Sequence, residues 1–168
     1  MSDKVHTRNA TLADVAAISA LHARVFGPGR FARSAYRVRE GRRDGNAPSA
    51  LCRVALRGNR IIASVTLNDI RIGGAAGGVL LGPLAVDPDF SGQGFGSQLI
   101  REGLEAARTA GARIVLLVGD EPYYGRLGFK RVPPGQITLP GPVDPLRLLA
   151  ADLEDGALAA SRGGVTAA

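Results

Sequence analysis

Apolar residues recur at helical spacing near the start of the chain. Val15, Ile18, Leu21 and Val25 lie three or four residues apart, which predicts a helix with one buried face. Thr11 precedes this stretch and is a typical N-cap residue. The other elements predicted in this part of the chain are a strand over 5–8, a second helix over 31–40 and a polar loop over 41–48.

Three apolar runs with the character of strands follow, and turns join them. The runs cover residues 50–56, 61–72 and 79–86, and the turns cover 57–60 and the six small residues 73–78. Adjacent strands that are joined by short turns pair antiparallel. The sequence therefore predicts an antiparallel meander in the middle of the chain.

A helix and a wholly apolar strand come after the meander. Leu99, Ile100, Leu104 and Ala107 share one helical face, and the run 114–118 is apolar at every position, as expected for a strand covered on both faces. A strand, a helix and a second strand in this order form a crossover between parallel strands. We therefore predict an α/β fold, with a mixed α+β sheet in which an antiparallel N-terminal meander leads into a parallel β-α-β crossover.

The C-terminal part of the chain carries shorter patterns. A short helix is predicted over 122–127, a strand over 129–132, and a strand or short helix over 146–153. The residues from Gly156 onward are small and rich in glycine, so we expect them to fray. The predicted organisation is one domain over residues 1–155, followed by a flexible tail over 156–168.

Composition and charge narrow the function only slightly. The 168 residues can bury an ordinary core, and a single cysteine, Cys52, excludes a disulfide within the chain and favours a cytoplasmic location. The net charge of +6 favours anionic ligands. We expect no nucleic-acid partner from charge alone. No apolar run approaches the ~20 residues that span a bilayer, so we also expect no membrane partner, and we expect no metal site.

Three alternate glycines, Gly92, Gly94 and Gly96, lie where the last strand of the meander gives way to a helix. Glycine weakens ordered segments, so this pattern requires a reason. The start of a helix attracts anions through its free N–H groups and its dipole, and glycine lets phosphate oxygens approach the backbone. The stretch is therefore suited to a pyrophosphate, and the alternative is a flexible turn before an ordinary helix.

Pro83 lies in an apolar run that is otherwise typical of a central strand. Because proline cannot donate to a sheet ladder, a β-bulge is expected there. A bulge would open a gap between this strand and the parallel run 114–118, and would leave backbone amides free to pair with an extended ligand. A gap that pairs with amides beside a pyrophosphate cradle suits coenzyme A, whose pantetheine arm carries two amides.

The stretch from about Leu80 to Phe129 resembles a known family. The motifs at 80–88, 92–96, 117–120 and 123–129 are similar to those of the GNAT superfamily of N-acetyltransferases, in particular its YhbS-like group. The resemblance implies a GNAT-like fold with splayed parallel strands and acetyl-CoA (coenzyme A) as the cofactor. It also implies transfer of an acetyl group to a primary amine by direct attack in a ternary complex.

Roles for single residues follow from the same resemblance. Tyr124 matches the tyrosine that protonates the departing coenzyme A thiolate in many members, whereas a packed aromatic is the alternative reading of the residue itself. Tyr123 is expected in the core or in a substrate wall. Ser91 departs from the family, which usually has Gln or Arg there. The backbone groups implied to bind the pantetheine arm and the pyrophosphate belong to Leu84, Ala85, Val86, Gly92, Gln93, Gly94, Phe95, Gly96 and Ser97.

The residues leave the general base open. Asp69, Asp120 and Glu121 are candidates, but acidic residues at a helix start also complement the helix dipole. His22 and Cys52 are expected to be ordinary buried residues. The basic cluster near the second helix is either a solvated loop or a preference for acidic acceptors, and consists of Arg37, Arg39, Arg42 and Arg43.

Other functions use the same features. A non-catalytic sensor that binds coenzyme A would share the fold. A nucleotide-dependent oxidoreductase fits less well, because a dinucleotide fingerprint that starts at Gly92 requires glycine where Ser97 stands, and a phosphate-binding NTPase would need Gly-Lys-Ser/Thr after the loop. The acceptor, a small-molecule amine or a protein amine, stays open, and the resemblance suggests a homodimer.

Overall fold

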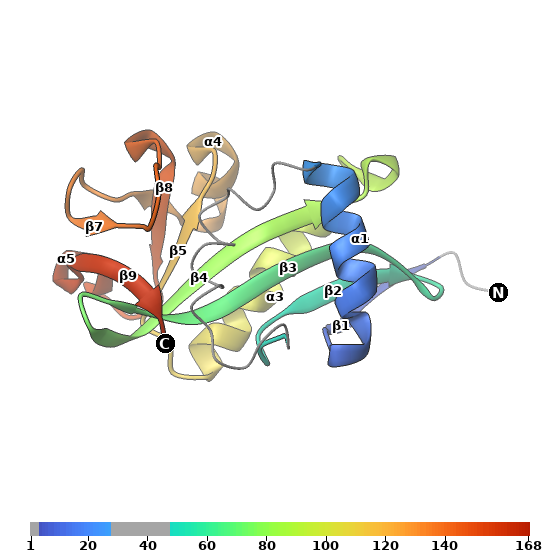
Figure 1. Cartoon of the computed structure of the whole chain (residues 1–168), viewed down its shortest axis with the longest axis horizontal. Helices are drawn as coiled ribbons and strands as arrows, with labels where there is room; N and C mark the ends of the chain where they lie inside the picture. Colours follow the sequence, from blue (N-terminus) through green and yellow to red (C-terminus); the bar gives the residue numbers. More distant parts are fainter. Residues whose placement is uncertain (1–3, 28–47) are drawn as a thin grey trace.

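The computed structural model describes residues 4–27 and 48–168, and a mixed sheet is the main feature of this part of the chain (Figure 1). The strands follow the spatial order β1-β2-β3-β4-β5-β8-β6, while β9 pairs with β3 and β7. Their bounds are β1 Val5–Asn9, β2 Arg53–Arg57, β3 Arg60–Ile72, β4 Ala75–Val86, β5 Ile114–Val118, β6 Lys130–Arg131, β7 Ile137–Thr138, β8 Leu148–Asp152 and β9 Gly163–Ala167.

The helices lie on both faces of this sheet, with α1 in front and α3 behind in Figure 1. Leu67 of β3 packs under α3, since a Cβ atom added to Gly103 of that helix would lie 3.1 Å from the Leu67 side chain. The helices are α1 (Val15–Phe26), α3 (Phe95–Thr109), α4 (Glu121–Tyr124) and α5 (Ala157–Ala160), with single turns at Leu12–Asp14, Pro88–Phe90, Gly125–Leu127 and Pro145–Arg147.

The meander and the crossover that the sequence predicts are confirmed. Strands β1 to β4 pair antiparallel in sequence, and β4 pairs parallel with β5 after the crossover through α3. The turn between β3 and β4 is shorter than predicted. Only Gly73 and Gly74 form it, both with positive φ, because Ala75 already pairs with Ile72.

The prediction that residues 156–168 fray is wrong. Residues 163–167 form β9, in which Val165 pairs with Ile72 and Ala167 pairs with Ile70. The physical reason is the length of β3, whose pairing with β2 ends at Val65 and leaves its last residues with a free edge. The burial of Val165 between two exposed neighbours is the alternation of a strand.

One prediction that was left open is resolved, and three others concern residues outside the described parts. The segment over 146–153, left open as strand or helix, is a single turn followed by strand β8. The predicted helix over 31–40, most of the loop over 41–48 and the four arginines between 37 and 43 lie outside the described residues. Among the helices of the described parts, none has the length and apolar character needed to cross a membrane.

Candidate active site

Strands β4 and β5 separate part of the way along their length. They pair only where Gly78–Leu80 lies beside Ile114–Leu116. Beyond that point β5 still pairs with β8 and β4 still pairs with β3, but no described strand pairs with residues 81–86 of β4 on the β5 side. The gap that the sequence predicts is present, and it leaves one edge of β4 open.

A β-bulge lies at the start of this open edge. Val65 of β3 faces Leu84, whereas Leu67 faces Leu81, so one residue of β3 opposes Gly82 and Pro83 of β4. The Gly82–Pro83 peptide bond is cis. The bulge predicted at Pro83 is confirmed, and it accommodates the missing N–H of proline within a long strand.

The glycine turn joins the open edge of β4 to helix α3. Gly92 and Gly94 have φ values of 74° and 88°, and a Cβ atom on either would meet nothing within 4 Å. The first helical hydrogen bond runs from the Gln98 N–H to the Gly94 carbonyl at 3.0 Å, so the N–H groups of residues 95–97 lie ahead of it at the helix end. These donors and the open space around the two glycines are suited to an anion, and together they are called the cradle below.

Gly96 is needed for a different reason than the sequence suggests. Its backbone is helical, and an added Cβ atom would lie 3.3 Å from both the Val86 side chain and the Tyr123 hydroxyl. Glycine is therefore needed here because protein side chains lie close by. The lack of a side chain lets the start of α3 pack against the end of β4. Leu84 lies in the same contact at 3.4 Å, so the structure brings the strand residues and the glycine turn together.

A buried carboxylate holds the backbone just before the glycine turn. Asp87 has no exposed side-chain area, and it accepts hydrogen bonds from Arg24 of α1 at 2.8 Å and from Arg60 of β3 at 2.6 Å. The Asp89 N–H also donates to it at 3.0 Å. Burial alone would raise the pKa of the Asp87 carboxyl, but these hydrogen bonds and the two positive charges outweigh burial and lower it.

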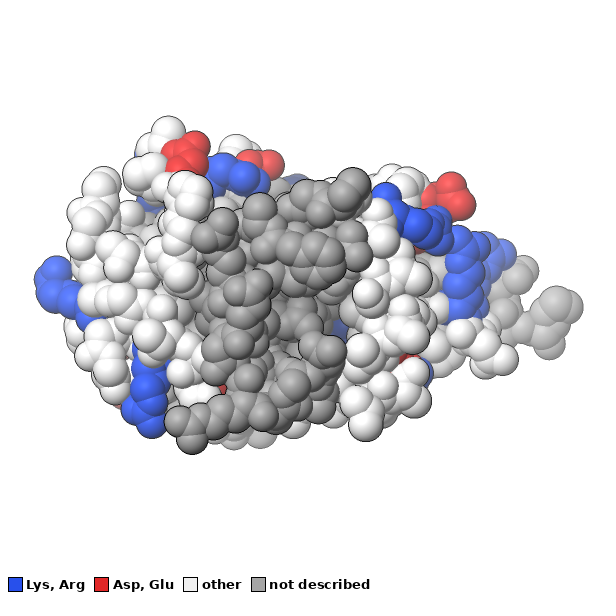
Figure 2. Space-filling view, viewed as in Figure 1, with Lys and Arg blue, Asp and Glu red and all other residues white. Residues whose placement is uncertain are grey.

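Asp87 and its partners Arg24 and Arg60 are called the Asp87 clamp below. Further basic side chains lie on the surface at the same end of the molecule. Arg57 and Arg60 lie over the ring of Phe90 at 5.7 and 5.8 Å, which are cation–π distances. Figure 2 shows basic side chains gathered at the end where the β2–β3 turn projects. The backbone cradle therefore lies close to a positively charged surface, which favours an anionic ligand.

The two tyrosines of α4 have different surroundings. The Tyr123 hydroxyl forms a hydrogen bond with the Ser97 hydroxyl at 2.9 Å, and so connects α4 to the start of α3. Tyr124 is half-buried, and its ring packs edge-on against Phe129 and Tyr123. A Cβ atom on Gly119 would lie 2.3 Å from the Tyr124 ring, so glycine is required at the end of β5.

The acidic candidates for a base have structural partners or lie apart from the cradle. Asp120 lies 3.3 Å from Arg147, and Glu121 accepts a hydrogen bond from Arg131 at 2.9 Å. Asp69 is exposed and pairs across from Val79, next to the closed end of the gap. The two ion pairs account for Asp120 and Glu121 without a catalytic role.

The remaining candidates from the sequence lie in the core. His22 is buried, with Nε2 3.4 Å from the Ser64 hydroxyl, and Cys52 is a buried free thiol within 3.4 Å of the Leu67 N–H. Ser91, which departs from the family pattern, donates a hydrogen bond to the Pro88 carbonyl at 3.0 Å.

Sequence reasoning missed three features, namely the Asp87 clamp, the Ser97–Tyr123 hydrogen bond and the Gly119–Tyr124 contact.

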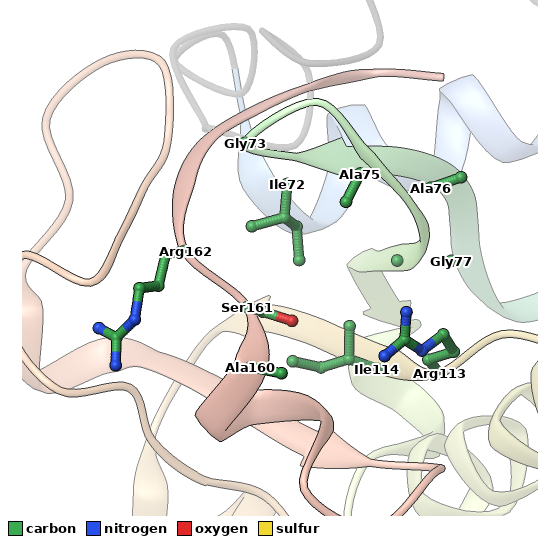
Figure 3. Close-up of a pocket in the computed structure, with 11 residues that line it drawn as sticks. Ile72, Gly73, Ala75, Ala76, Gly77, Arg113, Ile114, Ala160, Ser161 and Arg162 are labelled. Carbon is green, nitrogen blue, oxygen red and sulfur yellow. The ribbon is translucent and has the colours of Figure 1, made fainter.

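A cavity of about 260 Å³ lies at the other end of β4 and does not belong to this site (Figure 3). Gly77, Ile114 and Ser161 are among the residues that line it. Arg113 and Arg162 also line it, but Arg162 points away from Arg113 in Figure 3, and Arg113 donates to Glu154 at 2.5 Å. The two arginines therefore do not form a joint anion site.

Comparison with curated proteins finds similarity over a short stretch. The chain is 45% identical to the uncharacterised N-acetyltransferase YjhQ of Escherichia coli over 51 residues, and 42% identical to the uncharacterised N-acetyltransferase YhbS of the same organism over 50 residues. The aligned stretch covers 30% of this chain in both cases. It spans only 28% of YjhQ and 30% of YhbS.

Comparison with solved structures extends over nearly the whole chain. The GNAT family N-acetyltransferase YhbS from E. coli, solved in complex with CoA, has a TM-score of 0.83 and 28% identity, and the match covers 100% of this chain and 92% of that one. A GNAT family acetyltransferase from Brucella melitensis in complex with acetyl-CoA has a TM-score of 0.66 and 31% identity, with coverage of 89% and 96%. The fold is therefore the GNAT fold.

The family model described as acetyltransferase (GNAT) family matches residues 16–129. This range contains the parts of the site described above, from the Arg24 end of the clamp to the tyrosines of α4. The similarity thus covers the residues that open the sheet and form the cradle, and the chain belongs to the acetyltransferase (GNAT) family.

Proposed function

We propose that this chain transfers the acetyl group of acetyl-CoA to a primary amine by direct attack. The observation that carries the proposal is the continuous backbone surface from the open edge of β4 over 81–86 to the glycine turn over 92–97. Backbone groups of Leu84 and Val86 would pair with the amides of the pantetheine arm. The N–H groups of the cradle would hold the pyrophosphate.

The residues present fit this cofactor. A side chain at position 92 or 94 would occupy the open space at the helix end, and both positions carry glycine with positive φ. The open edge supplies backbone donors and acceptors of the kind that an extended amide arm requires. The two relatives solved with CoA and acetyl-CoA support the same assignment.

Acetyl-CoA supplies an activated thioester when it is bound. In the proposed reaction the amine nitrogen forms a bond with the acetyl carbon, and the bond from that carbon to sulfur breaks. The Tyr124 hydroxyl would donate its proton to the departing sulfur, since it stands on α4, directly after the strand on the other side of the gap. The amine nitrogen loses a proton to solvent, and the phenol regains one. No residue is assigned as the base.

Thermal shift and thiol release test this proposal in two steps. A ligand at 100 times its Kd stabilises the fold by ~2.7 kcal/mol, which raises the Tm by about 5–10 °C for a domain of this size. We expect this shift with acetyl-CoA and none with NAD, together with thiol release in the presence of a panel of primary amines. A shift without thiol release for any amine identifies a sensor instead of an enzyme.

Replacement of Tyr124 by Phe tests the proposed acid. The ring packing against Phe129 is retained by phenylalanine, so the thermal shift with acetyl-CoA should be unchanged. The turnover number should fall by about 10²-fold or more, in the range that general acids contribute. A variant with wild-type turnover removes Tyr124 from the mechanism and leaves the transferase proposal intact.

A further inference from the structure

A row of polar side chains lies in the centre of the sheet, on the face opposite α3. Ser64, Thr66 and Asn68 of β3 alternate with Leu67, which packs under α3, so the three point to the side covered by α1. His22 of α1 contacts Ser64 on that side. The three residues are 1%, 8% and 3% exposed.

Apolar residues border this row on the neighbouring strands, so polar side chains at these positions are unusual. Val54 of β2 pairs with Ser64, and Leu80 of β4 pairs with Asn68, and both are buried. Residues at these positions of a central strand are ordinarily apolar, because a buried polar group must find a hydrogen-bond partner. Ser64 has His22 as its partner at 3.4 Å.

Asn68 does not find such a partner. Its amide nitrogen Nδ2 is buried without a hydrogen bond, and it is the one side-chain nitrogen or oxygen atom in this condition among the residues that the structure describes. A buried donor left unpaired destabilises a fold, whereas an apolar side chain of similar shape at the same place would not. An unpaired buried group in a native structure requires an explanation, and a hydrogen bond to a ligand is one that the position of Asn68 supports.

Asn68 lies level with the closed end of the gap between β4 and β5. Its partner Leu80 is the last residue of β4 that pairs with β5, and the open edge begins at the next residue. If the pyrophosphate occupies the glycine turn, the pantetheine arm runs from there back along the open edge. Its thioester end then lies toward the closed end of the gap, which is the end beside Asn68.

We infer that the Asn68 amide nitrogen donates a hydrogen bond to an oxygen atom of the acceptor, on the face of the sheet opposite α3. The inference rests on the proposed function and names its substrate class. The bond cannot go to the reacting amine, because the lone pair of that nitrogen must attack the acetyl carbon. The partner is therefore a second, oxygen-bearing group close to the amine.

The surroundings of Asn68 favour an uncharged oxygen. Among the described residues, the row itself consists of amide and hydroxyl groups, and a carboxylate placed against these neutral buried groups would lose its hydration without gaining a charge from them. A polyamine carries donors only and would leave the Asn68 nitrogen unpaired. The acceptor class is a primary amine with a neighbouring amide carbonyl or hydroxyl, as in the N-terminus of a peptide or an amino alcohol.

A pair of matched amines tests the inference. Glycinamide carries an amide carbonyl next to its amine, and propylamine has similar size without any oxygen. The measured quantity is the ratio of kcat/KM for glycinamide to that for propylamine, in which the intrinsic reactivity of each amine cancels between wild type and variant. Asn68→Leu removes the donor at similar size, and the same exchange at exposed Asn59 in the β2–β3 turn is the control.

We expect the ratio to fall about tenfold or more in Asn68→Leu and to stay unchanged in Asn59→Leu. Asn68→Asp, which keeps the shape but replaces the donor with an acceptor, should lower the ratio as well. The Tm of Asn68→Leu should equal or exceed that of the wild type, and its thermal shift with acetyl-CoA should be unchanged. If Asn68 instead has a structural role, with a hydrogen-bond partner inside the protein, its replacement by Leu should lower the Tm.

The outcomes separate this inference from the proposed function. An unchanged ratio in Asn68→Leu, or a lowered Tm with an equal loss for both amines, overturns the role of Asn68 while acetyl transfer stands. A wild-type chain that binds acetyl-CoA but releases no thiol with either amine or with any other primary amine overturns the proposed function itself, and the inference with it.

Discussion

Replacement of Asp87 by Asn tests how the turn before the cradle is held in place. The carboxylate is fully buried, and its charge is balanced by Arg24 and Arg60, whose side chains are 49% and 53% exposed. Asparagine keeps the shape and leaves no cavity, so the change isolates the charge. All three groups that point at the side chain are donors, so the new amide nitrogen faces a donor instead of an acceptor.

The magnitude follows from what each partner loses. Hydrogen bonds to charged groups contribute ~1.5–3 kcal/mol each, and breaking a fully buried ion pair costs about 3–5 kcal/mol. Here both arginines can regain water through their exposed portions, so neither is left as a buried unpaired charge. We therefore expect Asp87→Asn to lower the free energy of unfolding by about 2–4 kcal/mol at pH 7.

The pH dependence gives a second readout of the same clamp. Because the folded-state pKa of Asp87 is below its ordinary value, its stabilisation is complete above the unfolded pKa of ~3.9 and is lost as the pH falls through the folded value. The difference in unfolding free energy between wild type and variant should therefore be constant from pH 7 to about pH 5 and should shrink below about pH 4.

Urea unfolding at several pH values measures both effects. Asp89→Asn is the matched control, because its side chain is exposed while its backbone N–H still donates to Asp87. It should change the free energy of unfolding by less than about 0.5 kcal/mol. A loss below about 0.5 kcal/mol for Asp87→Asn at pH 7, or a difference that persists undiminished at pH 2, would refute the clamp.

Three other contacts lead to predictions of the same kind. Arg8 holds the pKa of Asp14 at about 2 instead of 3.8, so Asp14→Asn should cost about 2 kcal/mol at pH 7 in urea unfolding, with the difference lost as the pH falls from about 4 to 2. Gly119→Ala should cost about 1–3 kcal/mol and reduce thiol release, because its Cβ atom displaces the Tyr124 ring; unchanged stability and activity would contradict that contact. In a double-mutant cycle, Ser97→Ala and Tyr123→Phe should couple by about 0.5–1.5 kcal/mol, and additive effects would show that the hydrogen bond contributes nothing.

Local patterns predict the elements that carry the site. Alternation and periodicity indicated the meander and the crossover, and the conflict between Pro83 and its apolar neighbours located the bulge and the gap. These features depend on residues close in sequence. The backbone limits which residue types can occupy such positions, as the missing N–H of Pro83 does. The positive φ values of Gly92 and Gly94 belong to the same class.

Contacts between distant residues were not predictable in this way. The clamp at Asp87 needs Arg24 and Arg60, which are 63 and 27 residues away, and no local pattern relates them. The Ser97–Tyr123 hydrogen bond depends on the distance between α3 and α4, which the packing of the whole sheet determines. The unpaired Asn68 nitrogen is a property of its surroundings and not of its residue type.

The place of β9 in the sheet has a consequence for synthesis of the chain. Ile70 and Ile72 pair with residues that are translated 97 and 93 positions later, so among the described strands none covers this edge of β3 while the intervening chain emerges from the ribosome. Nascent copies stalled within that interval expose the same edge to one another. Truncation before β9 should therefore produce aggregation in the cell in place of a smaller folded protein.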